Sequence, residues 1–207
     1  MFIRYLWLDP RFFAAAIFLV IFSICCHEFM HALTALKFGD DTAARHGHLT
    51  LNPLKQMGWI SLAMLLFLGI AWGQVPVDPA NFRRRRDRVL TSLAGPLTNL
   101  ALWIAFGALS YACLKWRGTE DFAGNMLVYG AIMNFALFVL NLLPVPGPDG
   151  FNVLYEYFPR LFRRDSEVVK GAFFILVALL FAFSERLFDL ARIATALILI
   201  GLDKVWS

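Results

Sequence analysis

Long apolar runs separated by short polar connectors dominate the chain. The first run covers residues 12–38 and ends at Gly39, and two further runs cover residues 89–116 and 122–143. Each run reaches or exceeds the ~20 residues that a helix needs to cross the hydrocarbon layer of a bilayer. The pattern therefore predicts a bundle of helices that crosses a membrane several times.

The last apolar stretches are shorter. Residues 171–183 and 187–202 are separated by Ser184-Glu185-Arg186, which we interpret as a polar turn between two short spans or within a broken helix pair. The predicted fold class is all-α, a multi-pass transmembrane helical bundle of about 5–6 membrane segments. We expect residues 1–207 to form a single membrane-embedded domain, because the connectors leave little room for a second one.

Residues 57–73 form an ambiguous apolar run that is interrupted by glycines. Basic residues lie in the connectors on both sides of it, and the positive-inside tendency places both connectors in the cytoplasm. We therefore predict a short re-entrant segment here, although Arg4 and Arg11 then fall on the outer side and count against this topology. Just before it, residues 48–52 alternate weakly, which favours a short β-like segment.

Composition supports a membrane protein. The chain is 59% hydrophobic and 16% charged, whereas soluble domains have roughly 45–50% apolar and about 25% charged residues. The net charge of +4 is modest, and its main cluster, Arg83 to Arg86 with Arg88, lies between apolar runs. Such a cluster signals topology or contacts anionic lipid, so we expect no nucleic-acid partner. Three cysteines, an odd number, give no disulfide framework.

The first apolar run contains the motif His27-Glu28-Phe29-Met30-His31. Ionisable side chains are costly inside a membrane segment and are functional candidates there by default. On a helix, His27 and His31 share one face because they are four residues apart. This spacing lets both rings bind one Zn²⁺, with Glu28 beside them in reach of a water molecule. The motif therefore indicates a zinc hydrolase that works within the bilayer.

A zinc hydrolase needs a third protein ligand, and the best candidate is Asp149. It lies in residues 141–150, a segment rich in proline and glycine that follows an apolar run. Irregular backbone at membrane depth is tolerated only where it is buried in protein or lines a wet cavity. If residues 57–73 do not cross, this segment and the end of the motif helix meet on the cytoplasmic side.

Three blocks of sequence carry a resemblance to a known family. They are His27-Glu28-Phe29-Met30-His31, Leu93-Ala94-Gly95-Pro96-Leu97-Thr98-Asn99, and the segment from Asn141 to Gly150 with the pattern N-x-x-P-x-x-x-x-D-G. In this order the chain resembles the site-2 protease family of intramembrane zinc metalloproteases, in the short bacterial form without a PDZ domain. It departs from the family pattern at Pro148, where leucine is common, at His48, where arginine is common, and near Gly73-Gln74, where a basic residue is missing.

The resemblance implies one Zn²⁺ per chain, held by His27, His31 and Asp149, with Glu28 as general base. Asn141 and Asn99 are candidates for binding the substrate backbone or the oxyanion. The implied function is a zinc-dependent intramembrane endopeptidase that hydrolyses peptide bonds in or near the transmembrane segments of other proteins. The implied location is a bacterial inner membrane, with the lipid bilayer and transmembrane substrates as partners and the site toward the cytoplasm.

Two alternatives stay open. In a different membrane peptidase with the same histidine motif, Glu120, Glu156 or Glu167 would replace Asp149 as the third ligand. A non-proteolytic scaffold or a chaperone for membrane helices would retain the fold without the reaction. The intact Glu28 argues against this second alternative, because the base is the part of such a site that is most easily lost. The sequence carries no signal for the substrate's identity or the oligomeric state.

Overall fold

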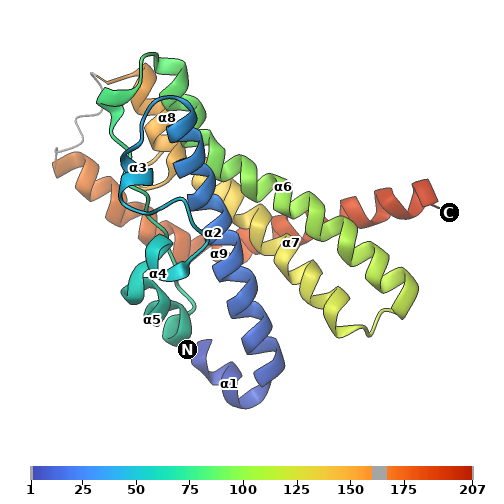
Figure 1. Cartoon of the computed structure of the whole chain (residues 1–207). Coiled ribbons are helices and arrows are strands. Elements are labelled where there is room, and N and C mark those ends of the chain that lie inside the picture. Colours follow the sequence, from blue (N-terminus) through green and yellow to red (C-terminus); the bar gives the residue numbers. More distant parts are fainter. Residues whose placement is uncertain (1, 160–166, 207) are drawn as a thin grey trace.

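Helices of very different lengths make up the part of the chain that the computed structural model describes, residues 2–159 and 167–206 (Figure 1). No β-strand occurs among these residues, in agreement with the all-α prediction. The elements in chain order are η1 (Phe2–Arg4), α1 (Tyr5–Leu8), α2 (Pro10–Lys37), α3 (Thr42–Arg45), α4 (Pro53–Gln56), α5 (Gly58–Leu68), η2 (Pro79–Asn81), α6 (Arg85–Arg117), α7 (Phe122–Asn141), α8 (Asp149–Tyr157) and α9 (Glu167–Trp206).

Within the described residues, three helices are long and apolar enough to cross a membrane: α2, α6 and α7. They correspond to the three long apolar runs of the sequence. Helix α2 begins where Asp9 accepts a hydrogen bond from the Phe12 N–H at 3.0 Å and Pro10 occupies the first helical position. It ends before Gly39, whose φ of 101° favours glycine. The total of 5–6 membrane segments stays a prediction.

The predicted polar turn at Ser184-Glu185-Arg186 is wrong, because α9 continues through these residues as one helix. None of the three is a helix breaker such as glycine or proline. Glu185 and Arg186 are exposed on the helix surface, so their polarity needs no break in the backbone. Helix α8 ends at Tyr157, and residues 160–166, before α9, lie outside the described residues.

The two ends of the segment at residues 57–73 lie next to each other. Helix α5 has 11 residues, or about 16 Å at 1.5 Å per residue, which is too short for a ~30 Å hydrocarbon layer. The chain then runs back along the helix, and the Ser61 hydroxyl bonds to both the N–H and the C=O of Trp72 at 2.9 and 2.7 Å. The Gln74 N–H donates to the Gln56 carbonyl at 2.9 Å. Both flanks of the segment therefore lie side by side, as a re-entrant segment requires.

The β-like segment predicted at residues 48–52 is a loop without strand structure. The Gln56 side-chain amide donates to the carbonyls of His48 and Thr50 at 2.8 and 2.6 Å. Asn52 caps α4 by accepting from the Leu54 N–H at 3.0 Å. The Gln56 side chain therefore uses carbonyl groups that a strand partner would otherwise bind, and the start of α4 ends the segment at Asn52.

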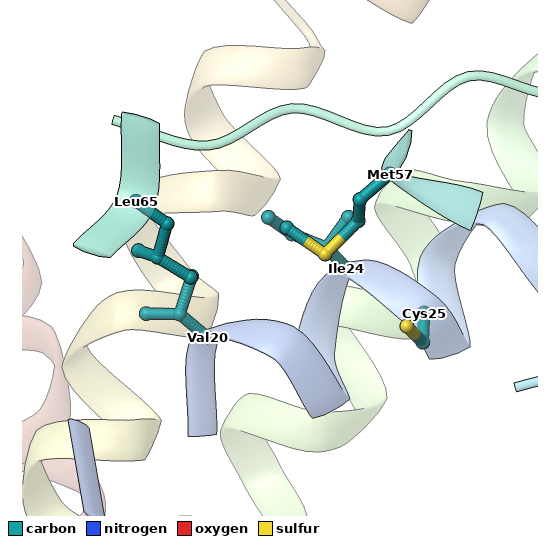
Figure 2. Close-up of a cluster of buried hydrophobic side chains, with 5 residues drawn as sticks. All are labelled: Val20, Ile24, Cys25, Met57 and Leu65. Atoms are coloured by element: carbon teal, nitrogen blue, oxygen red, sulfur yellow. The ribbon is translucent and has the colours of Figure 1, made fainter. Parts of the chain in front are cut away.

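Helix α2 packs against other elements on two sides. On one side, Val20, Ile24 and Cys25 form a buried apolar cluster with Met57 and Leu65, so that α5 is held against α2 (Figure 2). On the other side, α2 packs against α6 and α7, which also pack against each other. Helix α8 lies against α6, and α9 contacts both α6 and α7. This arrangement brings the middle of α2 and the start of α8 to the same part of α6.

Asp40 anchors the connector at residues 74–82 to the end of α2. Its buried carboxylate accepts hydrogen bonds from the backbone N–H of Asp78 and the side-chain amide of Asn81, both at 2.8 Å. It also accepts from the N–H and the hydroxyl of Thr42. Burial alone would raise the pKa of Asp40, but these bonds favour the charged form and bring the pKa below its ordinary value. The connector is thereby fixed beside the site described next.

Candidate metal centre

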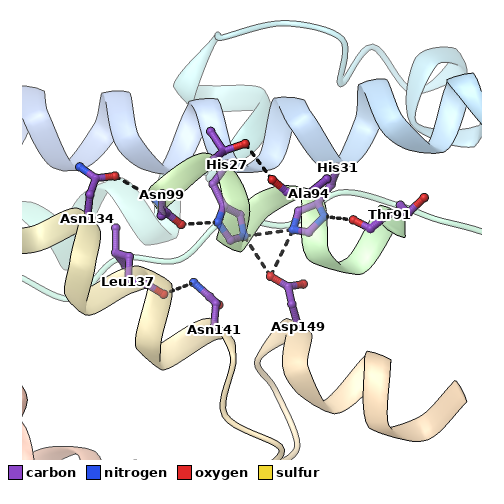
Figure 3. Close-up of polar contacts among 10 residues, drawn as sticks. His27, His31, Thr91, Ala94, Asn99, Asn134, Leu137, Asn141 and Asp149 are labelled. Atoms are coloured by element: carbon purple, nitrogen blue, oxygen red, sulfur yellow. Dashed lines mark hydrogen bonds and ion pairs between the residues drawn. The ribbon is translucent and has the colours of Figure 1, made fainter. Parts of the chain in front are cut away.

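Three side chains converge where α2, α6 and α8 meet (Figure 3). The Nε2 atoms of His27 and His31, both on α2, lie 3.0 Å apart. Asp149, the first residue of α8, places its Oδ2 atom 3.1 Å from the His27 Nε2 and 3.2 Å from the His31 Nε2. Both histidines are 7% exposed. In the part of the chain that is described, no other cluster of histidine, cysteine and acidic side chains could hold a metal ion.

The donor set fits a zinc ion. Zn²⁺ binds imidazole nitrogen and carboxylate oxygen at ~2.0–2.2 Å, so two ligands of a tetrahedral ion lie roughly 3.3 Å apart. The three separations between His27, His31 and Asp149 are 3.0 to 3.2 Å, close to this value. Three protein ligands leave one position open, which is the arrangement of catalytic rather than structural zinc sites. A donor set of two nitrogens and one oxygen also differs from the four-cysteine set of many structural zinc sites.

The outer nitrogen of each ring is held by α6. The Nδ1 atom of His31 lies 2.7 Å from the Thr91 carbonyl oxygen, and the Nδ1 atom of His27 lies 2.6 Å from the Asn99 Oδ1. Partners of this kind orient the ring of a metal-binding histidine and leave its other nitrogen free for the ion. Both Nε2 atoms accordingly point to Asp149 (Figure 3).

Gly95 lets α6 approach the two rings. A Cβ atom at this position would overlap the Nε2 atoms of both His27 and His31. The backbone of α6 therefore forms the wall of the centre, and any side chain there would enter the space between the ligands. The same helix carries Thr91 and Asn99 one turn to each side, so that one stretch of α6 both orients the rings and leaves room for an ion.

Asp149 is placed by a tight turn between α7 and α8. After α7 ends at Asn141, the chain turns back, and Gly150 packs so closely on the Leu142 carbonyl that a Cβ atom there would overlap it. Pro148, which departs from the family pattern, has φ −63° and ψ 161° and precedes the helix without strain. Burial would raise the pKa of Asp149, but its contacts with His27 and His31 lower it below its usual range.

A polar cavity of about 460 Å³ opens onto the centre. Glu28, 7% exposed, lines it beside His27 and Asp149. The backbone at Gly73, just before the connector, passes directly over Glu28, because a Cβ atom on Gly73 would overlap that carboxylate. Asn141 also lines the cavity. The site thus offers a carboxylate and an amide next to the convergent histidines.

The two predicted asparagines are placed differently. The Asn141 amide donates to the Leu137 carbonyl of its own helix at 3.0 Å and stands in the cavity wall. Asn99 is fully buried between helices and contacts His27 instead of the cavity. Their proposed roles in substrate binding stay predictions.

The alternative third ligands are not part of the cluster. Glu156 lines the same cavity, but Arg88 donates to its carboxylate at 2.7 Å. Glu120 lies in the exposed turn between α6 and α7, and the side chain of Glu167 lies outside the described residues. Among the candidates that are described, Asp149 is the one within reach of both histidines.

Sequence reasoning missed several residues around the site. Thr91 acts through its backbone carbonyl, which no motif reveals. Asn134 and Ser23 lie behind Asn99 in a buried hydrogen-bonded chain. A signal for Asn134 was present, because it is the one amide side chain between residues 126 and 140, an otherwise apolar part of α7.

Known proteins similar to this chain are named for one activity. The chain is 33% identical over 187 residues to a Bacillus subtilis protein named putative zinc metalloprotease YwhC, and the match covers 86% of this chain and 84% of the relative. It is 31% identical over 206 residues to the putative zinc metalloprotease Rip2 of Mycolicibacterium smegmatis, covering 90% of the chain and 78% of the relative. Rip2 of Mycobacterium tuberculosis is 33% identical over 203 residues, covering 89% and 78%. No family model matches the chain, and no solved structure matches it significantly.

Matches of this extent cover most of the chain and most of each relative. Three helices long enough to cross a membrane accompany them in the described residues. Together these findings indicate a membrane protein. The chain carries all three sequence blocks of the family in the family's order: the histidine pair of α2, the glycine and asparagine of α6, and the Asp149 turn. With these blocks and these relatives, the chain belongs to the site-2 protease family.

Proposed function

We propose that this protein is a zinc-dependent intramembrane endopeptidase. The observation that carries the proposal is the convergence of His27, His31 and Asp149 in one cavity with Glu28. The three relatives above bear the name of zinc metalloproteases, which supports the same chemistry. His27, His31 and Asp149 are the proposed ligands of one Zn²⁺ per chain, and Glu28 is the proposed general base.

Zinc held by these ligands would supply Lewis acidity, which activates water and polarises a carbonyl group at neutral pH. Glu28 lines the cavity beside the ligands, where its carboxylate can take the proton of the attacking water and return it to the leaving amine. The Asn141 amide stands in the same wall and can donate to the substrate carbonyl as negative charge develops on it. Asn99 acts through His27, which it contacts.

The substrates that we propose are transmembrane segments of other proteins. The motif lies on α2, a helix long enough to cross the membrane, so a soluble chain would have to enter an apolar environment to reach it. A helical segment hides its amides in its own hydrogen bonds and must unwind locally before cleavage. Basic connectors flank the end of α2 nearest the site, so we place the site toward the cytoplasm of a bacterial inner membrane.

The experiment that tests this function uses purified protein in proteoliposomes with a set of tagged single-span membrane peptides. We expect cleavage within or near the span of at least one peptide, loss of cleavage after 1,10-phenanthroline treatment, and its return when Zn²⁺ is added. The reason is that all the activating chemistry depends on the ion. Cleavage fragments are identified by mass spectrometry, and zinc is measured in parallel. Cleavage by protein shown to be free of zinc would contradict the proposal, and zinc-loaded protein that cleaves no peptide would favour the scaffold alternative.

A further inference from the structure

A chain of buried polar side chains runs from the candidate metal centre into the apolar contact between α2, α6 and α7. Its members are His27 and Ser23 on α2, Asn99 on α6 and Asn134 on α7. Asn99 and Asn134 are 0% exposed, and Ser23 is 1% exposed. Burying amides in an apolar environment is costly unless they are fully hydrogen-bonded, so the direction of each bond in this chain can be worked out.

The far end of the chain fixes the orientation of the Asn134 amide. Its Nδ2 atom donates to the Gly130 carbonyl and to the Ser23 hydroxyl, both at 2.8 Å. The Ser23 hydroxyl in turn donates to the Leu19 carbonyl at 2.7 Å. Carbonyl oxygens only accept hydrogen bonds, so the NH₂ group of Asn134 must face Gly130 and its Oδ1 must face Asn99.

The orientation then passes to His27. The Oδ1 atom of Asn134 accepts from the Asn99 Nδ2 at 3.0 Å, which leaves the Asn99 Oδ1 toward His27 at 2.6 Å. An amide oxygen only accepts, so the Nδ1 atom of His27 must carry the hydrogen. The Nε2 atom of His27, which faces Asp149 and His31, is then the nitrogen with a free lone pair.

We propose that Asn134 is a positioning residue for the metal centre, which acts through Asn99 to hold the His27 ring with its Nε2 atom ready for the ion. His31 obtains the same orientation directly, because the Thr91 backbone carbonyl accepts from its Nδ1–H. His27 instead faces the side-chain amide of Asn99, which could rotate and present its NH₂ group. The bond to Asn134 prevents this rotation, so the Asn99 oxygen stays toward His27 as a backbone carbonyl would. This inference rests on the proposed function, since it assigns a role in binding the proposed zinc.

A simpler role for Asn134 would be to hold α7 against α2 and α6. Buried polar contacts between membrane helices do stabilise packing modestly. The two roles differ in what they predict, because a packing role affects the stability of the bundle without altering the orientation of His27. The test therefore needs a variant that keeps the donor–acceptor direction of these hydrogen bonds, and a control that removes a buried contact elsewhere.

The variants are Asn134→Leu, Asn134→Asp and Thr195→Val. Leucine is close in size and removes the acceptor for Asn99. Aspartate is nearly isosteric and offers Asn99 an oxygen acceptor in either protonation state, so it preserves the direction of the hydrogen bond from Asn99. Thr195 is the matched control, because its buried hydroxyl accepts from the Trp103 indole N–H at 3.1 Å between α6 and α9, and neither residue lines the cavity or belongs to the ligand cluster.

The readouts are the zinc dissociation constant, from competition with a chelator, and the ¹⁵N–¹H spectrum of the four histidine rings in zinc-loaded protein. Helix content and thermal unfolding establish that each variant is folded. We expect Asn134→Leu to raise the dissociation constant about 10–100-fold, the range for loss of an outer partner of a metal-binding histidine, and to shift the Nδ1–H signal of His27. Asn134→Asp and Thr195→Val should stay near wild type in both readouts.

Two results would overturn the inference. In one, Asn134→Leu binds zinc as wild type does and leaves the His27 signal unchanged. In the other, Thr195→Val or Asn134→Asp weakens zinc binding as much as Asn134→Leu, which would assign Asn134 to packing alone. If Asn134→Leu does not fold, Asn134→Asp keeps the inference falsifiable: it retains the acceptor for Asn99, so a zinc dissociation constant raised tenfold or more in folded Asn134→Asp would contradict the inference. Wild-type protein that binds no zinc would instead contradict the proposed function.

Discussion

Replacement of Glu28 by glutamine is expected to abolish peptide cleavage while zinc content stays at the wild-type level. Glutamine has nearly the same shape but cannot take a proton from water, and loss of a general base typically costs about 10²–10⁴-fold in rate. Zinc binding should survive, because the proposed ligands are His27, His31 and Asp149, and Glu28 is not part of that cluster. Cleavage of membrane-embedded peptide in proteoliposomes and zinc content by mass spectrometry measure the two effects on the same preparation.

The matched control is Glu120→Gln, which makes the same chemical change in the exposed turn between α6 and α7. It should leave both cleavage and zinc content unchanged. Cleavage by Glu28→Gln at a rate within tenfold of wild type would mean that another group takes the proton. Loss of zinc from Glu28→Gln would mean that Glu28 contributes to the metal centre itself.

A single methyl group at position 95 is expected to remove zinc from the protein. In Gly95→Ala, the new Cβ atom would overlap the Nε2 atoms of both His27 and His31, the atoms that we propose bind the ion. The backbone of α6 cannot easily move away from the two rings, because the same stretch of helix holds them through Thr91 and Asn99. We expect the zinc dissociation constant to rise by at least about 100-fold, a loss of roughly 2.8 kcal/mol at 1.4 kcal/mol per factor of ten.

Gly107→Ala on the same helix is the control for this experiment. A Cβ atom at position 107 would meet the Ile198 Cγ2 at 3.4 Å, a contact that a small shift can accommodate. This variant has the same gain in helix propensity as Gly95→Ala, so any difference in zinc binding reflects position. Wild-type zinc affinity in Gly95→Ala would contradict the placement of α6 against the two rings.

The parts of the site that the sequence predicted are those in which spacing alone sets geometry. His27 and His31 had to share a face once residues 12–38 were assigned to a helix. The convergence with Asp149 depended on residues 57–73 not crossing, and the hydrogen bond between Gln74 and Gln56 shows both ends of that segment together. The prediction of Asp149 as a ligand therefore depended on the membrane topology as much as on the chemistry of the residues.

Most of the features that the sequence did not predict depend on contacts between separate segments of the chain. Residues 48–52 alternate like a strand, but the buried Gln56 amide binds their carbonyls and keeps them in a loop. The polar triplet at 184–186 suggested a turn, but exposed polar side chains on a helix surface give the same local sequence. The clamp at Asp40 joins groups up to 41 residues away along the chain, which no local pattern encodes. The error at 48–52 and the missed clamp thus come from contacts between separate segments, whereas the error at 184–186 comes from a local pattern that fits a turn and a helix surface equally well.

The measurement that tests the central claim most directly is the zinc content of purified wild-type protein, His27→Ala, Asp149→Ala and Glu156→Ala under metal-replete conditions, each checked for helix content. We predict one zinc per chain in wild type and in Glu156→Ala, whose carboxylate pairs with Arg88 in the same cavity, and sharply reduced zinc in the other two variants. Full zinc content in Asp149→Ala, or its loss in Glu156→Ala alone, would contradict the assignment of His27, His31 and Asp149 as the ligands.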